Sequence, residues 1–327
     1  MASLAEKLRD CARGLLAEGK ADVVIGHAAG TLPMRSAPCF VRSAGEVEGL
    51  IFDHTCGANL AKYLVKDKPR GKKGEAAKPE KVALIAKGCD GRAAVQLVVE
   101  GQIARENVII IGVPCRGVID PHRLGEAVGG REVLSCRPEG ESLFVGGDGF
   151  KEKVELREVL SECCLSCRHP VPPVHDVLVE EAVEAPGGAD EFAAVEKLAA
   201  GSPDERWAFF EREFFKCIRC YACRNACPMC FCGECFIDQN DPQWFGKSTD
   251  PGDTMLFHAV RVMHTAGRCV DCGACVRACP VGVDIRALAK RAEKEVRERF
   301  GCEAGVSLEE APALAAFDED DPQEFIL

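Results

Sequence analysis

The sequence predicts an α/β N-terminal domain with parallel strands, followed by a mainly α-helical domain that carries paired cysteine motifs. Two observations support this. Residues 81–117 read as strand, loop, helix and strand, the order of a right-handed βαβ unit. Residues 204–279 hold two four-cysteine runs, each preceded by an amphipathic helix. We therefore expect an α/β domain over 1–175, a linker with a short helix over 176–202, the cysteine-rich domain over 203–300 and an acidic tail over 301–327.

Buried strands and helices justify the first domain. Lys81–Ala86 and Val108–Val113 are short apolar runs of strand formers, and the segment between them has a helical pattern over Arg92–Ala104. Parallel strands end at one edge of a sheet, so Cys89 and Cys115, which follow the two runs, should lie close together. Upstream, we expect strands at 21–26 and 38–42 and a helix at 56–65.

Charge and hydropathy limit the possible partners. The chain has 327 residues, with 41 Lys and Arg against 52 Asp and Glu, for a net charge of −11. An acidic chain does not suit nonspecific nucleic-acid binding, which needs a basic face. No stretch approaches the roughly 18 apolar residues of a membrane span. The N-terminus lacks a signal-peptide core, so we expect a cytoplasmic protein with no membrane span.

The 21 cysteines are the unusual feature of the composition. A cytoplasmic compartment keeps thiols reduced, which argues against a disulfide framework. Metal ligation, redox chemistry and packing remain, and the spacing of the cysteines distinguishes them. Isolated cysteines are expected to be packing residues: Cys11, Cys39, Cys136 and Cys302.

Two segments share the spacing C-x2-C-x2-C-x3-C-P, which is the bacterial ferredoxin pattern. Three cysteines of a run bind one cubane, and the fourth binds the neighbouring one. This predicts one 4Fe-4S cluster on Cys217, Cys220, Cys223 and Cys279. A second cluster is predicted on Cys227, Cys269, Cys272 and Cys275. The alternative is structural zinc, which usually takes two C-x2-C pairs.

Helices are expected to flank the two runs. Residues 204–216 form an amphipathic pattern in which Trp207, Phe210 and Phe214 share the face that would pack on the cluster domain. Residues 253–267 form a helix between the runs, with Leu256, Val260 and Met263 on one face. Its histidines, His258 and His264, are more commonly packing residues than ligands, although a hydrogen bond to cluster sulfur would tune a potential. Four arginines beside the runs could offset cluster charge or be solvated: Arg219, Arg224, Arg268 and Arg277.

Other cysteines suggest a third cluster. Its candidate ligands are Cys56, Cys89, Cys115, Cys164 and Cys167. The alternative is half-buried thiols together with a zinc or redox C-x2-C pair. For Cys230, Cys232 and Cys235 three interpretations stay open: additional ligands, a further cluster with a distant fourth thiol, or packing.

Residues 23–123 resemble the β-subunit family of deazaflavin-linked hydrogenases and dehydrogenases, through FDHTCGANLAKYL, AKGCDGRA and IIGVPCRG. The second run, in AGRCVDCGACVRACPVGV, is similar to the α-helical ferredoxin domains of heterodisulfide reductase and succinate dehydrogenase iron–sulfur subunits. The first resemblance implies an α/β domain that binds flavin beside iron–sulfur clusters. It also implies partner subunits between which electrons pass. No GxGxxG or Walker motif is present.

Together these features predict an iron–sulfur electron-transfer subunit of an anaerobic oxidoreductase complex, of the hydrogenase, formate dehydrogenase or heterodisulfide-reductase type. It would relay single electrons through two clusters, or three if the further candidates form a site. Other subunits of the complex would hold the catalytic centre, so no catalytic residue is assigned here. The alternative is a flavin-containing oxidoreductase subunit that exchanges hydride with a soluble carrier through its α/β domain.

Overall fold

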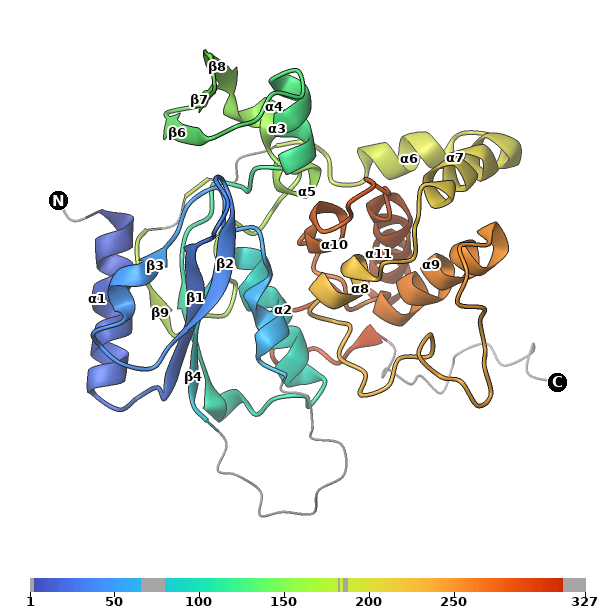
Figure 1. Cartoon of the computed structure of the whole chain (residues 1–327). Coiled ribbons are helices and arrows are strands. Elements are labelled where there is room, and N and C mark those ends of the chain that lie inside the picture. Colours follow the sequence, from blue (N-terminus) through green and yellow to red (C-terminus); the bar gives the residue numbers. More distant parts are fainter. Residues whose placement is uncertain (1–2, 66–79, 182, 185–187, 314–327) are drawn as a thin grey trace.

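The computed structural model describes residues 3–65, 80–181, 183–184 and 188–313 (Figure 1). Its N-terminal part is built on a mixed sheet with the strand order β2-β1-β4-β5-β9, and β3 also pairs with β1. The strands are β1 (Val23–Ala29), β2 (Ser36–Val41), β3 (Leu50–Ile51), β4 (Val82–Ala86), β5 (Val108–Gly112) and β9 (Val177–Leu178). Strands β1, β4, β5 and β9 run parallel, while β2 and β3 are antiparallel to β1. The predicted α/β fold with parallel strands is confirmed.

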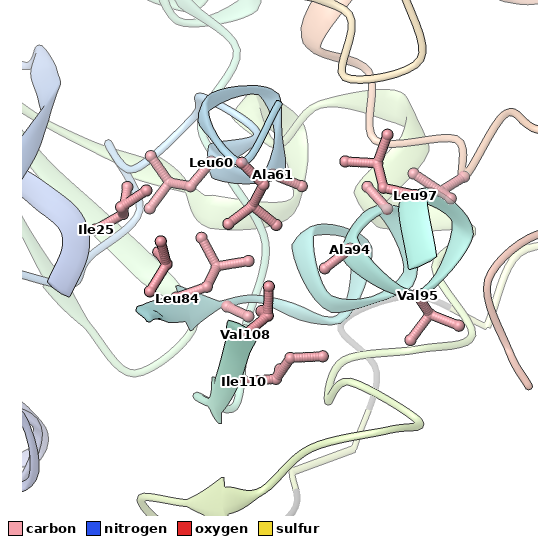
Figure 2. Close-up of a cluster of buried hydrophobic side chains, with 14 of the residues drawn as sticks. Ile25, Leu60, Ala61, Leu84, Ala94, Val95, Leu97, Val108 and Ile110 are labelled. Atoms are coloured by element: carbon pink, nitrogen blue, oxygen red, sulfur yellow. The ribbon is translucent and has the colours of Figure 1, made fainter. Parts of the chain in front are cut away.

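Helices cover both faces of this sheet (Figure 1). On one face, Leu8 and Ala12 of α1 (Leu4–Ala17) pack against sheet residues that include Ile85 and Ile111. On the other face, α2 (Gly88–Val99) and the 3-10 helix η2 (Leu60–Tyr63) pack on Leu84 and Ile110, as Figure 2 shows. Burial on both faces explains why β4 and β5 are continuous Val, Ile and Ala runs without polar alternation.

Two helix predictions need correction. The helix expected over 56–65 is only the short η2, because Cys56 lies in a turn and Asn59 caps the segment by accepting from Ala61 N–H. Helix α2 begins at Gly88, earlier than expected, because Asp90 accepts a hydrogen bond from Lys87 N–H at 3.1 Å. The loop expected over 88–91 is therefore the first turn of the helix.

A small unit that the sequence analysis did not predict stands beside the sheet. It contains α3 (Pro121–Ala127), the antiparallel strands β6 (Ser135–Glu139), β7 (Ser142–Gly147) and β8 (Phe150–Glu155), and α4 (Leu156–Val159). Leu143, Val145 and Val159 form part of its own small core. Strand β9 lies within the segment expected to be a linker, so that segment contributes to the sheet.

The C-terminal part is helical. It comprises α6 (Ala193–Ala199), α7 (Pro203–Phe215), α8 (Ala222–Ala226), α9 (Pro251–Thr265), α10 (Ala274–Arg277) and α11 (Arg286–Phe300). Phe214, Val262, Val283 and Ile285 form its buried core. The packing face expected for α7 is partly wrong, because Trp207 is 56% exposed. On α9 the apolar side chains Leu256 and Met263 are 48% and 66% exposed. The buried stripe of α9 runs instead through Phe257, His258, Arg261 and Val262.

Buried ion pairs join the two parts. Arg268 pairs with Glu100 at the end of α2. Glu303, after α11, forms ion pairs with Arg92, Arg168, His169 and Arg297 at 2.5 to 3.2 Å. Although burial acts to raise it, hydrogen bonding from His169 and the charges of Arg92 and Arg297 lower the pKa of Glu303 to about 2. These ion pairs fix the position of the helical part on the α/β part. Residues 314–327 of the expected acidic tail lie outside the described residues.

Within the described ranges, no helix has the length and apolar character needed to cross a bilayer. All 21 cysteines are free thiols.

Candidate metal centres

The two four-cysteine runs fold into loops with the same backbone. Arg219 and Tyr221 have φ angles of 56° and 60°, and Asp271 and Gly273 have 48° and 66°. In each run these residues stand immediately before and after the second cysteine. Only glycine adopts the left-handed region at no cost, so three of the four positions are strained. Backbone N–H groups that converge in such loops form a concave site for an anion, and many iron–sulfur sites are built this way.

Each loop leads into a short helix, and the two helices pack together. Tyr221 caps α8 and Gly273 caps α10, both in the left-handed conformation. The third cysteine of each run lies within its helix and the fourth follows the helix end. Contact between α8 and α10 therefore places the end of each run near the loop of the other.

The first predicted set of cysteines shares one cavity. Phe257 and His258 help to line it, together with Cys217, Cys220, Cys223 and Cys279, and Cys275 of the second set also reaches it. Two backbone groups donate to these sulfurs: Arg219 N–H to Cys217 Sγ at 3.4 Å and Val283 N–H to Cys279 Sγ at 3.3 Å. Bonds from N–H groups to sulfur stabilise a negatively charged cluster.

His258 gives this cavity an unused hydrogen-bond donor. The side chain is 2% exposed and stacks on Phe214 with ring centroids 4.9 Å apart. In the described part of the chain neither ring nitrogen has a hydrogen-bond partner. Burial, and then the charges of Arg261 and Arg219, lower the pKa of His258 to about 4. A neutral ring with a free N–H beside four thiols fits a sulfur acceptor, so the residues present suit a cubane.

The second predicted set is also grouped in space. Cys227 is an electrostatic neighbour of Cys272 and Cys275, and Cys269 neighbours the same two. Burial raises the pKa of Cys275 and of Cys272, the latter to about 12. Thiols with such pKa values ionise at neutral pH when a metal takes the place of the proton.

The two complete cysteine runs favour a cluster over zinc, which usually takes two C-x2-C pairs. Zinc requires its sulfur ligands about 2.3 Å from a single ion. A cubane gives each thiolate an iron of its own, so its ligands stand farther apart.

A second cysteine-lined cavity lies where the α/β part meets the helical part. It is lined by Cys89, Cys115, Cys163, Cys164, Cys167 and Cys272. As expected, Cys89 and Cys115 follow the neighbouring strands β4 and β5. Cys163, Cys164 and Cys167 come from α5 (Glu162–Leu165) and the loop after it. Because Cys272 belongs to the second predicted set, this cavity adjoins that set.

The structure does not bring Cys56 to this cavity. Its thiol is fully buried in a turn, where Asp53 N–H donates to Cys56 Sγ at 3.4 Å. Cys163, which was left out of the candidate set, does line the cavity. A hydrogen bond with Cys164 lowers the pKa of Cys163 to about 7 against the effect of burial, and the charge of Arg277 contributes. No signal in the sequence separates Cys163 from Cys164, because they are adjacent.

A buried cation stands beside the same cavity. Lys87 lines it and pairs with Asp90 at 2.8 Å, with side chains only 3% and 0% exposed. Burial opposes the charge of Lys87, but Asp90 and then the thiols of Cys89 and Cys115 hold its pKa above the usual value. The cavity therefore already contains positive charge suited to thiolates.

A third cavity, of about 430 Å³, opens between the small β unit and helices α8 and α10. Its lining includes the cations Arg35, Lys62 and Arg131, together with Ala226 and Ala274 of the two short helices. This size is within the range of cofactor pockets. It could not be predicted from the sequence, because its walls come from five separate segments.

Cys230 lies beside the second set. Its thiol neighbours Cys227, whose hydrogen bond lowers the pKa of Cys230 to about 7. Cys232 is exposed, and Cys235 neighbours Arg224. The three cysteines therefore differ in their exposure and in their neighbours.

Comparison with known proteins identifies a dicluster domain in the part of the chain that holds the two cysteine runs. A family model described as a 4Fe-4S dicluster domain matches residues 213–283, which contain both cysteine runs. The F420-dependent formate dehydrogenase subunit beta of Methanocaldococcus jannaschii is 24% identical over 330 residues, with 82% of this chain and 83% of the relative covered. The F420-dependent formate dehydrogenase 1 subunit beta of Methanococcus maripaludis is 25% identical over 360 residues, with 92% and 90% covered.

A solved structure of the F420-reducing [NiFe] hydrogenase complex from Methanosarcina barkeri also contains a similar chain. The TM-score is 0.36 at 17% identity, with 49% of this chain and 57% of that chain covered. The curated relatives are β subunits of deazaflavin-linked dehydrogenases, so the predicted relationship is confirmed, as is the presence of a 4Fe-4S dicluster domain.

Proposed function

We propose that this chain is the iron–sulfur electron-transfer subunit of a redox complex that acts on formate or hydrogen. The observation that carries the proposal is the pair of matching cysteine loops, packed together and adjoining a further cysteine-lined cavity. When bound, iron–sulfur clusters supply one-electron transfer. The residues of the chain hold the thiolates, exclude water and set the local charge. Its partners are the other subunits, and its compartment is the cytoplasm, where thiols stay reduced.

The proposed ligands are those expected from the spacing. Cluster 1 is held by Cys217, Cys220, Cys223 and Cys279, and cluster 2 by Cys227, Cys269, Cys272 and Cys275. Support comes from the shared cavity of the first set and the mutual proximity of the second. Iron and acid-labile sulfide, counted on anaerobically purified protein, should reach about eight each for two clusters, or twelve for three. Colourless protein with stoichiometric zinc would contradict the proposal.

A third cluster is proposed in the cavity at the junction, with Cys89, Cys115, Cys164 and Cys167 as its ligands and Cys163 as their neighbour. We propose no ligand role for Cys56. Changing Cys115 to Ser should lower the iron count from about twelve to about eight, whereas changing Cys56 to Ser should leave it at twelve. Equal losses in the two variants, or none in either, would refute this assignment.

The exposure of the thiols indicates at which cluster electrons would pass between this chain and a partner subunit. Cys220 of the first set is exposed, whereas Cys89 and Cys272, at the other end, meet within a closed junction between the two parts. Electrons would therefore cross to a partner subunit at cluster 1. Three side chains near that edge are also exposed: Phe215 at 61%, Ile218 at 54% and Val281 at 36%. A partner subunit that covers these residues would bring its own redox centre closest to cluster 1.

The second candidate function, a flavin-dependent hydride exchange, has one observation in its favour. The cavity of about 430 Å³ borders the two short cluster helices, and the four cations in its lining, which include Arg277, suit a phosphate-bearing cofactor. Acid-released flavin, measured by absorbance, should be about one per chain if this function holds. Flavin-free protein with full iron content would contradict this second function and favour electron transfer alone.

A further inference from the structure

Arg261 is a buried arginine without a carboxylate. It lies in the middle of α9 and is 5% exposed. Its Nη2 donates to the carbonyl oxygen of Cys223 at 3.1 Å, and its Nε has no hydrogen-bond partner in the described chain. No carboxylate of the described residues forms an ion pair with it. Other arginines at the clusters do: Arg224 pairs with Asp238 at 2.8 Å, and Arg268 pairs with Glu100.

A guanidinium in this position needs a negative group nearby. Removing an ion from water costs several kcal/mol even after the protein relaxes, unless an opposite charge or several hydrogen bonds replace the water. One carbonyl oxygen cannot replace it. The missing charge must therefore come from something close to Arg261.

The neighbouring sulfurs meet this requirement. The thiols that surround the Arg261 guanidinium are those of Cys275, Cys227, Cys230 and Cys223, and the thiols of Cys275 and Cys230 also form hydrogen bonds with it. Cys223 belongs to the first ligand set, and Cys227 and Cys275 to the second. The guanidinium thus lies between the two predicted clusters, with thiolates of both as its charged neighbours.

We propose that Arg261 is a shared counter-charge for clusters 1 and 2, which raises the reduction potentials of both and keeps them close to each other. The inference rests on the proposed function. Reduction of either cluster adds one electron and one negative charge, which a nearby cation stabilises. A charge between the clusters shifts both potentials in the same direction. The free energy of electron transfer from one cluster to the other therefore stays small.

Arg224 provides a matched control. It lies next to Cys223 on α8, but Asp238 neutralises its charge and its side chain is 20% exposed. Solvent screens its charge more strongly than it screens that of the buried Arg261. Removing Arg224 takes the same unit of charge from the same region, but it should move the cluster potentials less.

The test is an anaerobic redox titration of the full chain with dithionite, followed by electron paramagnetic resonance, on Arg261→Met, Arg261→Lys and Arg224→Met. Iron is counted on each sample first. Arg261→Met should lower the reduced-to-oxidised ratio of both clusters at least tenfold at a fixed potential, which for one electron is about 59 mV. Arg261→Lys, which keeps the charge, should recover most of the shift, and Arg224→Met should change the ratio less than about threefold.

Two results would overturn the inference: unchanged potentials in an Arg261→Met protein with full iron, or an equal shift in Arg224→Met. If Arg261→Met loses iron, Arg261→Gln replaces it and the same two results decide. An iron count near zero in the unchanged protein would instead refute the proposed function, so the two failures are distinguishable.

Discussion

His27 should make the stability of this protein depend on pH. The side chain lies in β1 and is 1% exposed. Burial, and then the charge of Lys87, lower its pKa from the ordinary 6.5 to about 3. The folded protein therefore holds the neutral ring, whereas the unfolded chain gains a proton below pH 6.5. Stability is complete above 6.5 and is lost progressively as the pH falls toward 3.

The size of the effect follows from the two pKa values. Between pH 8 and pH 5 the unfolded histidine becomes almost fully protonated and the folded one does not. The linkage relation then gives a loss of about 2 kcal/mol in the free energy of unfolding. Glutamine at this position does not titrate. The free energy of unfolding of the wild type, relative to that of His27→Gln, should therefore fall by about 2 kcal/mol from pH 8 to pH 5.

Guanidinium unfolding measures this difference, followed anaerobically by circular dichroism at pH 8, 7, 6 and 5 on samples of equal iron content. His264→Gln, at an exposed site, controls for the loss of a histidine as such. A difference between wild type and His27→Gln that stays constant from pH 8 to pH 5 would refute the reasoning.

Three further predictions concern the packing of the two parts. Changing Glu303 to Gln removes the negative charge that pairs with four basic side chains. This should lower the free energy of unfolding by about 3 kcal/mol in the same assay at pH 7. Changing Gly88 to Ala places a Cβ 1.7 Å from a backbone carbonyl oxygen and should cost more than about 3 kcal/mol, whereas Gly14→Ala, in open helix, should stabilise by about 0.5–1 kcal/mol. A double-mutant cycle on Arg268 and Glu100 should give a coupling energy of about 1.5–3 kcal/mol, and a value near zero would mean that this pair does not hold the parts together.

The parallel sheet and the cysteine runs could be predicted because their signals are local. Strands β4 and β5 are continuous apolar runs, and the ligand spacing of the two runs is a pattern within a dozen residues. The small β unit was missed because two of its three strands contain mainly polar and charged residues: β6 is Ser-Cys-Arg-Pro-Glu and β8 is Phe-Lys-Glu-Lys-Val-Glu. Its core comes from few positions, such as Leu143 and Val145. Pattern recognition has little to use in such a segment.

The environment of the site was harder to predict. Arg261 stands in a helix that was predicted, but the apolar face that the pattern indicates, with Leu256 and Met263, is exposed. Helical periodicity defines several apolar stripes when small and apolar residues surround the helix axis. Which stripe is buried depends on the neighbours, and α7 and α11, which pack on α9, are distant in sequence. The exclusion of Cys56 and the inclusion of Cys163 are likewise matters of tertiary position.

The matching loops also bear on how the protein matures after synthesis. Arg219, Tyr221 and Asp271 hold left-handed backbone that costs roughly 1–2 kcal/mol for each non-glycine residue. In a newly made chain without iron, the buried thiols stay protonated, so no bonds to a cluster offset this cost. The loops and the short helices α8 and α10 would then remain open until iron arrives. Folding of this region and insertion of its cofactors become a single event, which keeps the cysteines accessible to the delivery machinery and closes them once they are filled.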